Sequence, residues 1–150
     1  MRREDFTLVH PLRVRWAEVD MQHVVFNANY LMYFDVAIAE YWRAIATGAA
    51  RDFQDEYMKL YSVKATVEYH GSARYDELIE IGCRLARLGR SSMTFAFGIW
   101  RGQDYLVSGE LVYVHVEPGS RKGTPIPERL RKAMLDYERT PPDVASGATG

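Results

Sequence analysis

The stretch NANYLMYFDVAIAEYWRAI, residues 27–45, decides the fold of this 150-residue chain. Apolar side chains recur in it at steps of three and four residues, the period of one helix face. This series consists of Tyr30, Phe34, Ala37, Ile38, Tyr41, Trp42 and Ile45. Leu31, Met32 and Val36 widen the apolar surface beyond one stripe, so the sequence predicts a long helix wrapped by a sheet. Gly48 is its expected stop.

Strand-like runs lie on both sides of this helix. Residues 12–16 alternate apolar and basic side chains, which is the period of a half-buried strand. Later runs rich in β-branched and aromatic residues predict further strands over residues 61–69, 78–87, 93–100 and 105–116. Short turns that contain Gly71, Gly89 and Gly102 separate these runs, and such lengths favour antiparallel neighbours.

The C-terminal part predicts a short helix and a tail. Pro125 and Pro127 introduce the helix, because proline is favoured where a helix begins. Residues 1–139 are expected to form a single domain, and residues 140–150 have the composition of a flexible tail. The element order predicts an α+β domain in which an antiparallel sheet wraps around one long central helix.

Composition excludes several classes of function. Nineteen basic and 20 acidic residues give a net charge of -1, so no chain-wide field would attract nucleic acid or a membrane surface. The single cysteine, Cys83, cannot form an internal disulfide, and the four histidines form no pair with ligand spacing, so no metal site is expected. No segment resembles a signal peptide or a bilayer span, which predicts a cytoplasmic protein.

Chemistry concentrates in the segment DMQHVVFNANY, residues 20–30, where a carboxylate precedes the start of the long helix. Free N–H groups at a helix start can polarise a thioester carbonyl and stabilise its oxyanion. The carboxylate of Asp20 could attack that carbonyl or activate a water. The alternative is structural, because aspartate often bonds turns and Asn27 and Asn29 are ordinary helix-capping residues.

The same segment resembles the signature D-x-x-G-[hydrophobic]-V-[aromatic]-x-x-x-Y of 4-hydroxybenzoyl-CoA thioesterase-like acyl-CoA thioesterases. Asp20, the run 24–27 and Tyr30 match it without a gap, and the likeness extends from about Val14 to Val116. The resemblance implies the hotdog fold, Asp20 as the catalytic carboxylate, and the backbone N–H of Asn27 as an oxyanion donor. It also implies sites shared by two subunits and no cofactor, with CoA as part of the substrate.

One residue departs from this signature. His23 stands where the family usually has glycine, and a side chain there restricts a positive φ angle. The expected substrate pocket consists of His23, Val24, Phe26, Tyr30 and His70. Arg90, Ser91 and Ser92 follow a glycine turn and are expected to hold CoA phosphates, with a solvated hairpin as the alternative.

Three functions remain open from the sequence. The leading prediction is hydrolysis of an acyl-CoA, or of an acyl carrier protein thioester, with Asp20 as general base or nucleophile. An acyl-thioester dehydratase or hydratase would need a histidine paired with a carboxylate, for which His70 or His23 is available. The third is a non-catalytic acyl-CoA-binding module. A long β-edge and an over-apolar helix also predict a homodimer or a homotetramer built as a dimer of dimers.

Overall fold

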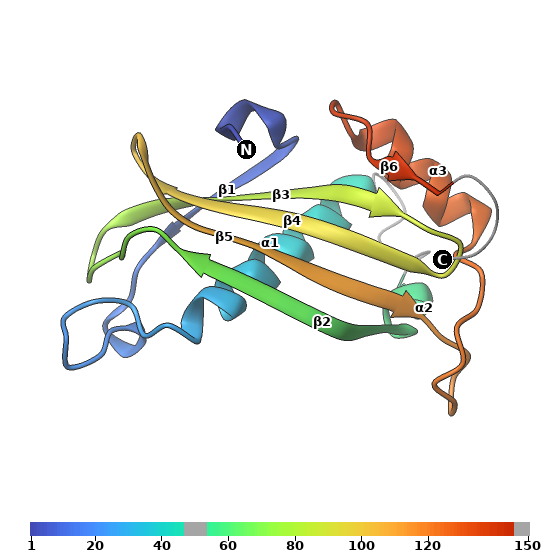
Figure 1. The fold of residues 1–150 in the computed structure, drawn as a ribbon, viewed down its shortest axis with the longest axis horizontal. Coiled ribbons are helices and arrows are strands. Elements are labelled where there is room, and N and C mark those ends of the chain that lie inside the picture. Colours follow the sequence, from blue (N-terminus) through green and yellow to red (C-terminus); the bar gives the residue numbers. More distant parts are fainter. Residues whose placement is uncertain (47–53, 146–150) are drawn as a thin grey trace.

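The computed structural model describes residues 1–46 and 54–145. Its elements in chain order are η1 (Arg3–Asp5), β1 (Leu8–Arg13), η2 (Trp16–Glu18), α1 (Asn29–Ile45), α2 (Gln54–Tyr57), β2 (Leu60–Tyr69), β3 (Leu78–Leu88), β4 (Ser92–Arg101), β5 (Asp104–His115), α3 (Glu128–Tyr137) and β6 (Asp143–Val144). The strands form one sheet in the order β1-β3-β4-β5-β2, with antiparallel neighbours, and β6 pairs with β3. Figure 1 shows α1 crossing one side of this sheet, which confirms the predicted α+β fold.

α1 packs against the sheet through aromatic side chains. Phe34 stacks on Phe97 of β4 with ring centroids 4.5 Å apart, and Tyr41 meets Phe95 edge-on at 5.0 Å. Gly109 of β5 permits this close approach, because a Cβ there would lie 2.5 Å from the Phe34 ring. The buried residues of α1 are Tyr30, Tyr33, Phe34, Ala37, Ile38, Tyr41 and Ile45. Their spacing is the helical period read from the sequence.

The boundaries of the first strand and of the long helix differ from the prediction. β1 begins at Leu8 and contains Pro11, which an edge strand tolerates because one of its sides needs no ladder partner. The chain then turns into η2 at Trp16, so residues 14–16 are not part of the strand. α1 begins at Asn29, two residues later than expected, and Gly48 lies outside the described residues.

Part of the segment expected to form a tail is paired with the sheet. β6 lies parallel to the end of β3, and the Ala145 N–H donates to the Leu88 carbonyl at 3.1 Å. A two-residue strand is too short to produce an alternating pattern, so no local signal predicts it. Among the described helices, none has the length and apolar content needed to cross a membrane.

β2 lies at one end of the sheet order, along the margin opposite the η1 and α3 side (Figure 1). Within the described chain it pairs only with β5. Most of its residues are exposed, including the large apolar side chains of Tyr61, Val63 and Tyr69. A ten-residue exposed edge is a template for pairing with another strand.

Candidate active site

Asp20 lies in a tight hairpin between η2 and α1. Val19 and Val25 form an antiparallel bridge, and the Asp20 N–H donates to the Val24 carbonyl at 2.9 Å. The His23 N–H donates back to the Asp20 carbonyl at 3.0 Å, which closes the turn. The Asp20 carboxylate accepts a hydrogen bond from the Gln22 N–H at 2.8 Å. The side chain is therefore held in the hairpin while remaining partly open to solvent.

The entry to α1 follows this hairpin directly. The Asn27 carbonyl accepts hydrogen bonds from the Tyr69 hydroxyl at 3.0 Å and from the Tyr30 N–H at 3.4 Å. The Asn27 N–H has no acceptor within the described part of the chain. It lies where unpaired N–H groups and the positive end of the helix dipole attract a partial negative charge. This position can therefore bind a carbonyl oxygen.

Glu18 joins the hairpin to the helix. Its backbone carbonyl accepts the Phe26 N–H and the Asn29 side-chain amide, both at 2.9 Å. Its carboxylate accepts the Tyr33 hydroxyl at 3.0 Å and the Arg15 Nε at 2.8 Å. Burial alone would raise the pKa of Glu18, but the hydrogen bonds from Arg15 and Tyr33 outweigh it and the pKa lies below its ordinary value. Glu18 is therefore an ionised acceptor at neutral pH.

The loop between β2 and β3 supports the hairpin from the other side. The Val25 N–H donates to the Ala73 carbonyl at 2.8 Å, and the Ala73 N–H donates to the Tyr30 hydroxyl at 3.0 Å. Tyr30 is only 2% exposed and meets the rings of Tyr33 and Tyr69 edge-on. Tyr30 therefore lies in the core, whereas Phe26 is exposed and Val24 is partly buried.

His23 adopts a backbone conformation that favours glycine. Its φ angle is +63°, in the left-handed region, and the residue is exposed. An L-residue there costs roughly 1–2 kcal/mol relative to ordinary helical or extended geometry. The hairpin thus keeps the conformation expected for a glycine at this position and carries an exposed histidine in the same turn as Asp20.

The side chain of His70 has its contacts on the outer face of the sheet. A Cβ on Gly109 would point at α1, so the neighbouring Ser108 faces the other side of the sheet. The His70 Nε2 is hydrogen-bonded to the Ser108 hydroxyl at 2.9 Å, and its ring stacks on Tyr105. His70 therefore lies on the face of the sheet away from α1, hydrogen-bonded to Ser108.

The residues expected to bind CoA lie at the far end of the sheet. Arg90, Ser91 and Ser92 form the turn into β4, and the 11 residues of β3 span roughly 35 Å between the two ends. Arg90 is exposed, and its carbonyl accepts the Ile126 N–H at 2.9 Å. Ser91 is buried. One protomer therefore does not bring these residues to Asp20.

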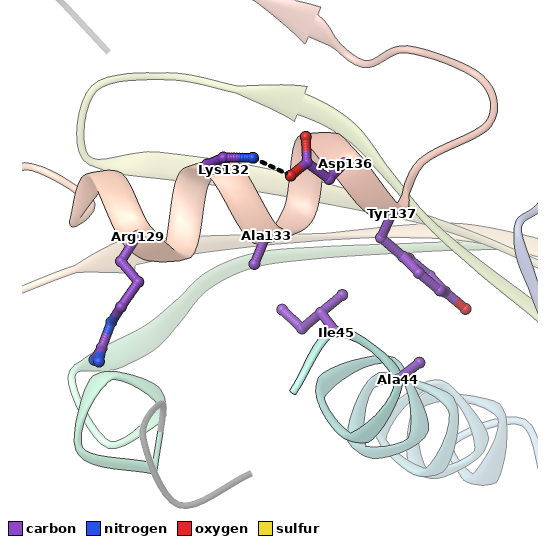
Figure 2. A pocket seen from close by; sticks show the side chains of 7 residues that line it. All are labelled: Ala44, Ile45, Arg129, Lys132, Ala133, Asp136 and Tyr137. Atoms are coloured by element: carbon purple, nitrogen blue, oxygen red, sulfur yellow. Dashed lines mark hydrogen bonds and ion pairs between the residues drawn. The ribbon is translucent and has the colours of Figure 1, made fainter. Parts of the chain in front are cut away.

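A groove of about 460 Å³ lies between the end of α1 and α3 (Figure 2). Its lining combines Ile45 and Tyr137 with an ion pair between Lys132 and Asp136. The 17-residue helix α1 is roughly 25 Å long, and this groove lies at the end opposite Asn29. It is therefore separate from the hairpin site. No group of three potential metal-ligating side chains occurs in residues 1–46 and 54–145.

The comparison with protein families assigns this chain to a known group. Residues 22–108 match the model of the Thioesterase superfamily. The chain belongs to this superfamily. The predicted family, the hotdog fold and the general class, a thioester hydrolase, are thereby confirmed. The matched range begins just after Asp20, so the catalytic roles of individual residues stay predictions.

Individual relatives agree with this membership. The acyl-CoA thioester hydrolase YbgC of Escherichia coli O6:H1 is 26% identical over 121 residues, covering 80% of this chain and 90% of that protein. The acyl-CoA thioesterase YbgC of Haemophilus influenzae is 21% identical over 124 residues, covering 83% and 91%. A thioesterase of Thermus thermophilus, solved as a complex with coenzyme A and Zn, is 25% identical with a TM-score of 0.79, covering 90% of this chain and 96% of that one.

Sequence reasoning about this superfamily member missed three side chains that build the site. Glu18 bonds to Asn29 and to Tyr33, and Tyr69 bonds to Asn27, yet none of Glu18, Tyr33 and Tyr69 was among the predicted site residues. Glu18 carried a weak local signal, because it is an acid two residues before Asp20 in an otherwise apolar stretch. The contact of Tyr69 with Asn27 depends on a separation of 42 residues, which no local pattern reveals.

Proposed function

We propose that this chain hydrolyses acyl-CoA thioesters at the hairpin between η2 and α1. The observation that carries the proposal is the Asn27 N–H at the start of α1, which has no acceptor among the described residues and follows directly on the hairpin that holds Asp20. The N–H binds the thioester oxygen and stabilises the tetrahedral oxyanion. A donor of this kind is typically worth about a hundred- to a thousand-fold in rate.

Asp20 supplies the second group that the reaction needs. As general base, it takes a proton from water while the water oxygen bonds to the carbonyl carbon. The intermediate then collapses, the C–S bond breaks, and the CoA thiolate leaves and takes up the proton. As nucleophile, Asp20 would instead displace the thiolate to form an anhydride, which water hydrolyses. In both routes CoA is a product and no cofactor takes part.

A second copy of the chain completes the site in this proposal. The exposed edge of β2 supports antiparallel pairing with β2 of a partner across a two-fold axis. Tyr69 contacts the start of α1, whereas Leu60 lies at the same end of the sheet as the Arg90 turn. Antiparallel pairing therefore brings the partner's CoA-binding end toward Asp20. The exposed Arg90 guanidinium is the side chain best suited to a phosphate there.

The position of His70 gives no support to the dehydratase alternative. That chemistry needs a histidine and a carboxylate at the same acyl chain. His70 lies on the face of the sheet away from α1 and bonds to Ser108, whereas the described hydrogen bonds of Asp20 are all within its hairpin. Hydrolysis needs only a carboxylate and an oxyanion donor, which the hairpin and the helix start provide together.

The proposal is tested by measuring free-thiol release from aromatic, short-chain and long-chain acyl-CoAs, and from an acyl carrier protein thioester. The wild type is compared with Asp20→Asn and with Asp136→Asn, which removes an exposed carboxylate on α3. We expect turnover by the wild type and Asp136→Asn, and a loss of about a hundredfold or more in Asp20→Asn. Binding without turnover would favour the non-catalytic module, and full activity in Asp20→Asn would remove Asp20 from the mechanism.

The two-subunit site has its own test. Val63 is an exposed apolar residue on the β2 edge, so Val63→Asp places a charge where a partner strand would pair. We expect dissociation in analytical ultracentrifugation together with lost thiol release. A wild type that sediments as a monomer and still hydrolyses acyl-CoA would overturn the shared site.

A further inference from the structure

Glu18 is a buried acid with bonds to three separate segments. Its side chain is 5% exposed, although it carries a charge. Besides the contacts with Tyr33 and the Arg15 side chain, its Oε1 accepts the Arg15 N–H at 2.9 Å. Its backbone carbonyl accepts hydrogen bonds from the Phe26 N–H and from the Asn29 side-chain amide. Burial of a carboxylate is costly unless its oxygens are fully hydrogen-bonded. The donors that surround Glu18 therefore fix its position relative to η2, the hairpin and α1.

We propose that Glu18 is a positioning residue that sets the first turn of α1 against the Asp20 hairpin in the catalytic arrangement. The inference rests on the proposed function, because it assigns Glu18 a role in the geometry of that site. Glu18 itself touches neither substrate nor reacting atoms.

The geometry of the contacts supports a positioning role. Asn29 and Tyr33 are four residues apart and therefore lie on one face of α1, one turn above the other. Both bond to Glu18, so the first turn is held at two points along its axis. The Phe26 N–H, immediately before Asn27, bonds to the same residue. A shift of Glu18 would therefore move the Asn27 N–H relative to Asp20.

Arg15 makes this anchor compatible with an oxyanion site. The Arg15 side chain is 64% exposed and reaches inward with its guanidinium to form an ion pair with Glu18. An unpaired carboxylate beside the helix start would repel the negative charge that develops on the thioester oxygen. The ion pair neutralises that charge while leaving Glu18 able to accept from Tyr33.

The chain offers a matched control for the effect on stability. Tyr41 lies farther along α1, is fully buried, and donates to a different carboxylate, Glu138, at 2.8 Å. Tyr33→Phe and Tyr41→Phe therefore each remove one buried hydroxyl–carboxylate hydrogen bond from the same helix. Only the first touches Glu18. If the Tyr33 bond served the fold alone, both variants would affect activity equally.

The experiment measures kcat and KM for acyl-CoA hydrolysis, and the denaturant midpoint, for wild type, Tyr33→Phe, Tyr41→Phe and Glu18→Gln. We expect kcat to fall about tenfold in Tyr33→Phe and about a hundredfold in Glu18→Gln, because a misplacement near 1 Å can cost that much. KM should change little, since binding of CoA does not use Glu18. Tyr41→Phe should lower the midpoint and leave kcat of the folded protein unchanged.

The outcomes separate this inference from the proposed function. Asp20-dependent turnover with equal kcat in Tyr33→Phe and Tyr41→Phe would overturn the role of Glu18 alone. A wild type without turnover would overturn both proposals. Because Glu18→Gln can also unfold the protein, the milder Tyr33→Phe decides the question. A selective fall in its kcat, with a midpoint no lower than that of Tyr41→Phe, supports the positioning role.

Discussion

The two ends of α1 carry the same chemical pair in different surroundings. Near its start, Tyr33 donates to Glu18 at 3.0 Å, and farther along, Tyr41 donates to Glu138 at 2.8 Å. All four residues are buried. Glu18 has a cation, Arg15, as its partner, and its pKa is lowered despite burial. The pKa of Glu138 is raised by burial.

Glu138 is held mainly by neutral donors. Its carboxylate accepts the Leu85 N–H at 2.7 Å and the Thr7 hydroxyl at 3.0 Å, besides the hydroxyl of Tyr41. Leu85 lies on β3 between Cys83, the last residue paired with β1, and Arg87, the first residue paired with β6, and its N–H donates to Glu138 instead of to a strand. One carboxylate therefore adjoins the proposed chemistry, while the other ties α3 to the sheet and to the N-terminal segment.

The largest effect on stability is expected at the Glu138 end. Glu138→Ala leaves the buried Leu85 N–H and the Tyr41 hydroxyl without their acceptor, and each such loss costs about 1–3 kcal/mol. We expect a fall of about 3–5 kcal/mol in the free energy of unfolding, measured with urea. The kcat of the molecules that remain folded should be unchanged. A loss of kcat in the folded protein would contradict the assignment of Glu138 to stability and of Glu18 to catalysis.

A change midway along α1 should affect both ends together. Gly109→Ala would place a Cβ 2.5 Å from both the Phe34 ring and the Thr66 carbonyl oxygen, so the helix must move away from the sheet. Overpacking of this kind typically costs about 1–3 kcal/mol. We expect a lower thermal midpoint and a lower kcat in the same variant. An unchanged thermal midpoint together with an unchanged kcat would show that the position of α1 does not depend on its close approach to Gly109.

His23→Gly should stabilise the hairpin. Glycine removes the steric cost of a φ angle of +63° but loses more freedom on folding, so we expect a net gain of at most about 1 kcal/mol. Chemical denaturation measures this gain. A change in kcat/KM together with higher stability would assign the imidazole to the substrate pocket, whereas lower stability would contradict the strain assigned to this φ angle.

The smallest effects are the pH dependences of the two glutamates, which have opposite signs. The raised pKa of Glu138 gives a stabilisation that is full below the ordinary value of 4.5 and is lost as pH rises through the raised pKa. The lowered pKa of Glu18 gives a stabilisation that is full above 4.5 and is lost as pH falls through the lowered pKa.

Urea unfolding on both sides of pH 4.5 measures these contributions. Glu138→Gln should remove a decline in stability above pH 4.5, and Glu18→Gln should remove a decline below it. Thr7→Val, which removes one minor donor to Glu138, serves as a control that retains both carboxylates. If the stability contributions of the two glutamates changed with pH in the same direction, the ion pair with Arg15 would not be what sets their pKa values apart.

The sequence predicted the parts of this molecule that depend on local periodicity. The apolar spacing of α1 follows from a helix burying one face, so it was readable without any tertiary contact. The start of β1 was missed because Pro11 argues against a strand unless the edge position is known. Short elements such as β6 depend on their partner and leave no pattern of their own.

The candidate site was predicted only in part for a related reason. The segment that contains Asp20 and Asn27 is contiguous, so its spacing could be compared with a family signature. The bond of Glu18 to Tyr33 spans 15 residues, and its importance depends on burial that no residue type reveals. The proposed approach of a partner's CoA-binding turn to Asp20 would depend on a second subunit, so the homo-oligomer, like the cytoplasmic location, stays a prediction.

The central claim, that the hairpin at the start of α1 carries out hydrolysis through Asp20, is tested most directly by a single-turnover measurement. Wild type and Asp20→Asn are each mixed in excess with the best acyl-CoA of the panel, and the dissociation constant is measured alongside the rate. We predict that Asp20→Asn binds with similar affinity but cleaves at least about a hundredfold more slowly. Equal single-turnover rates for the two proteins would contradict the claim.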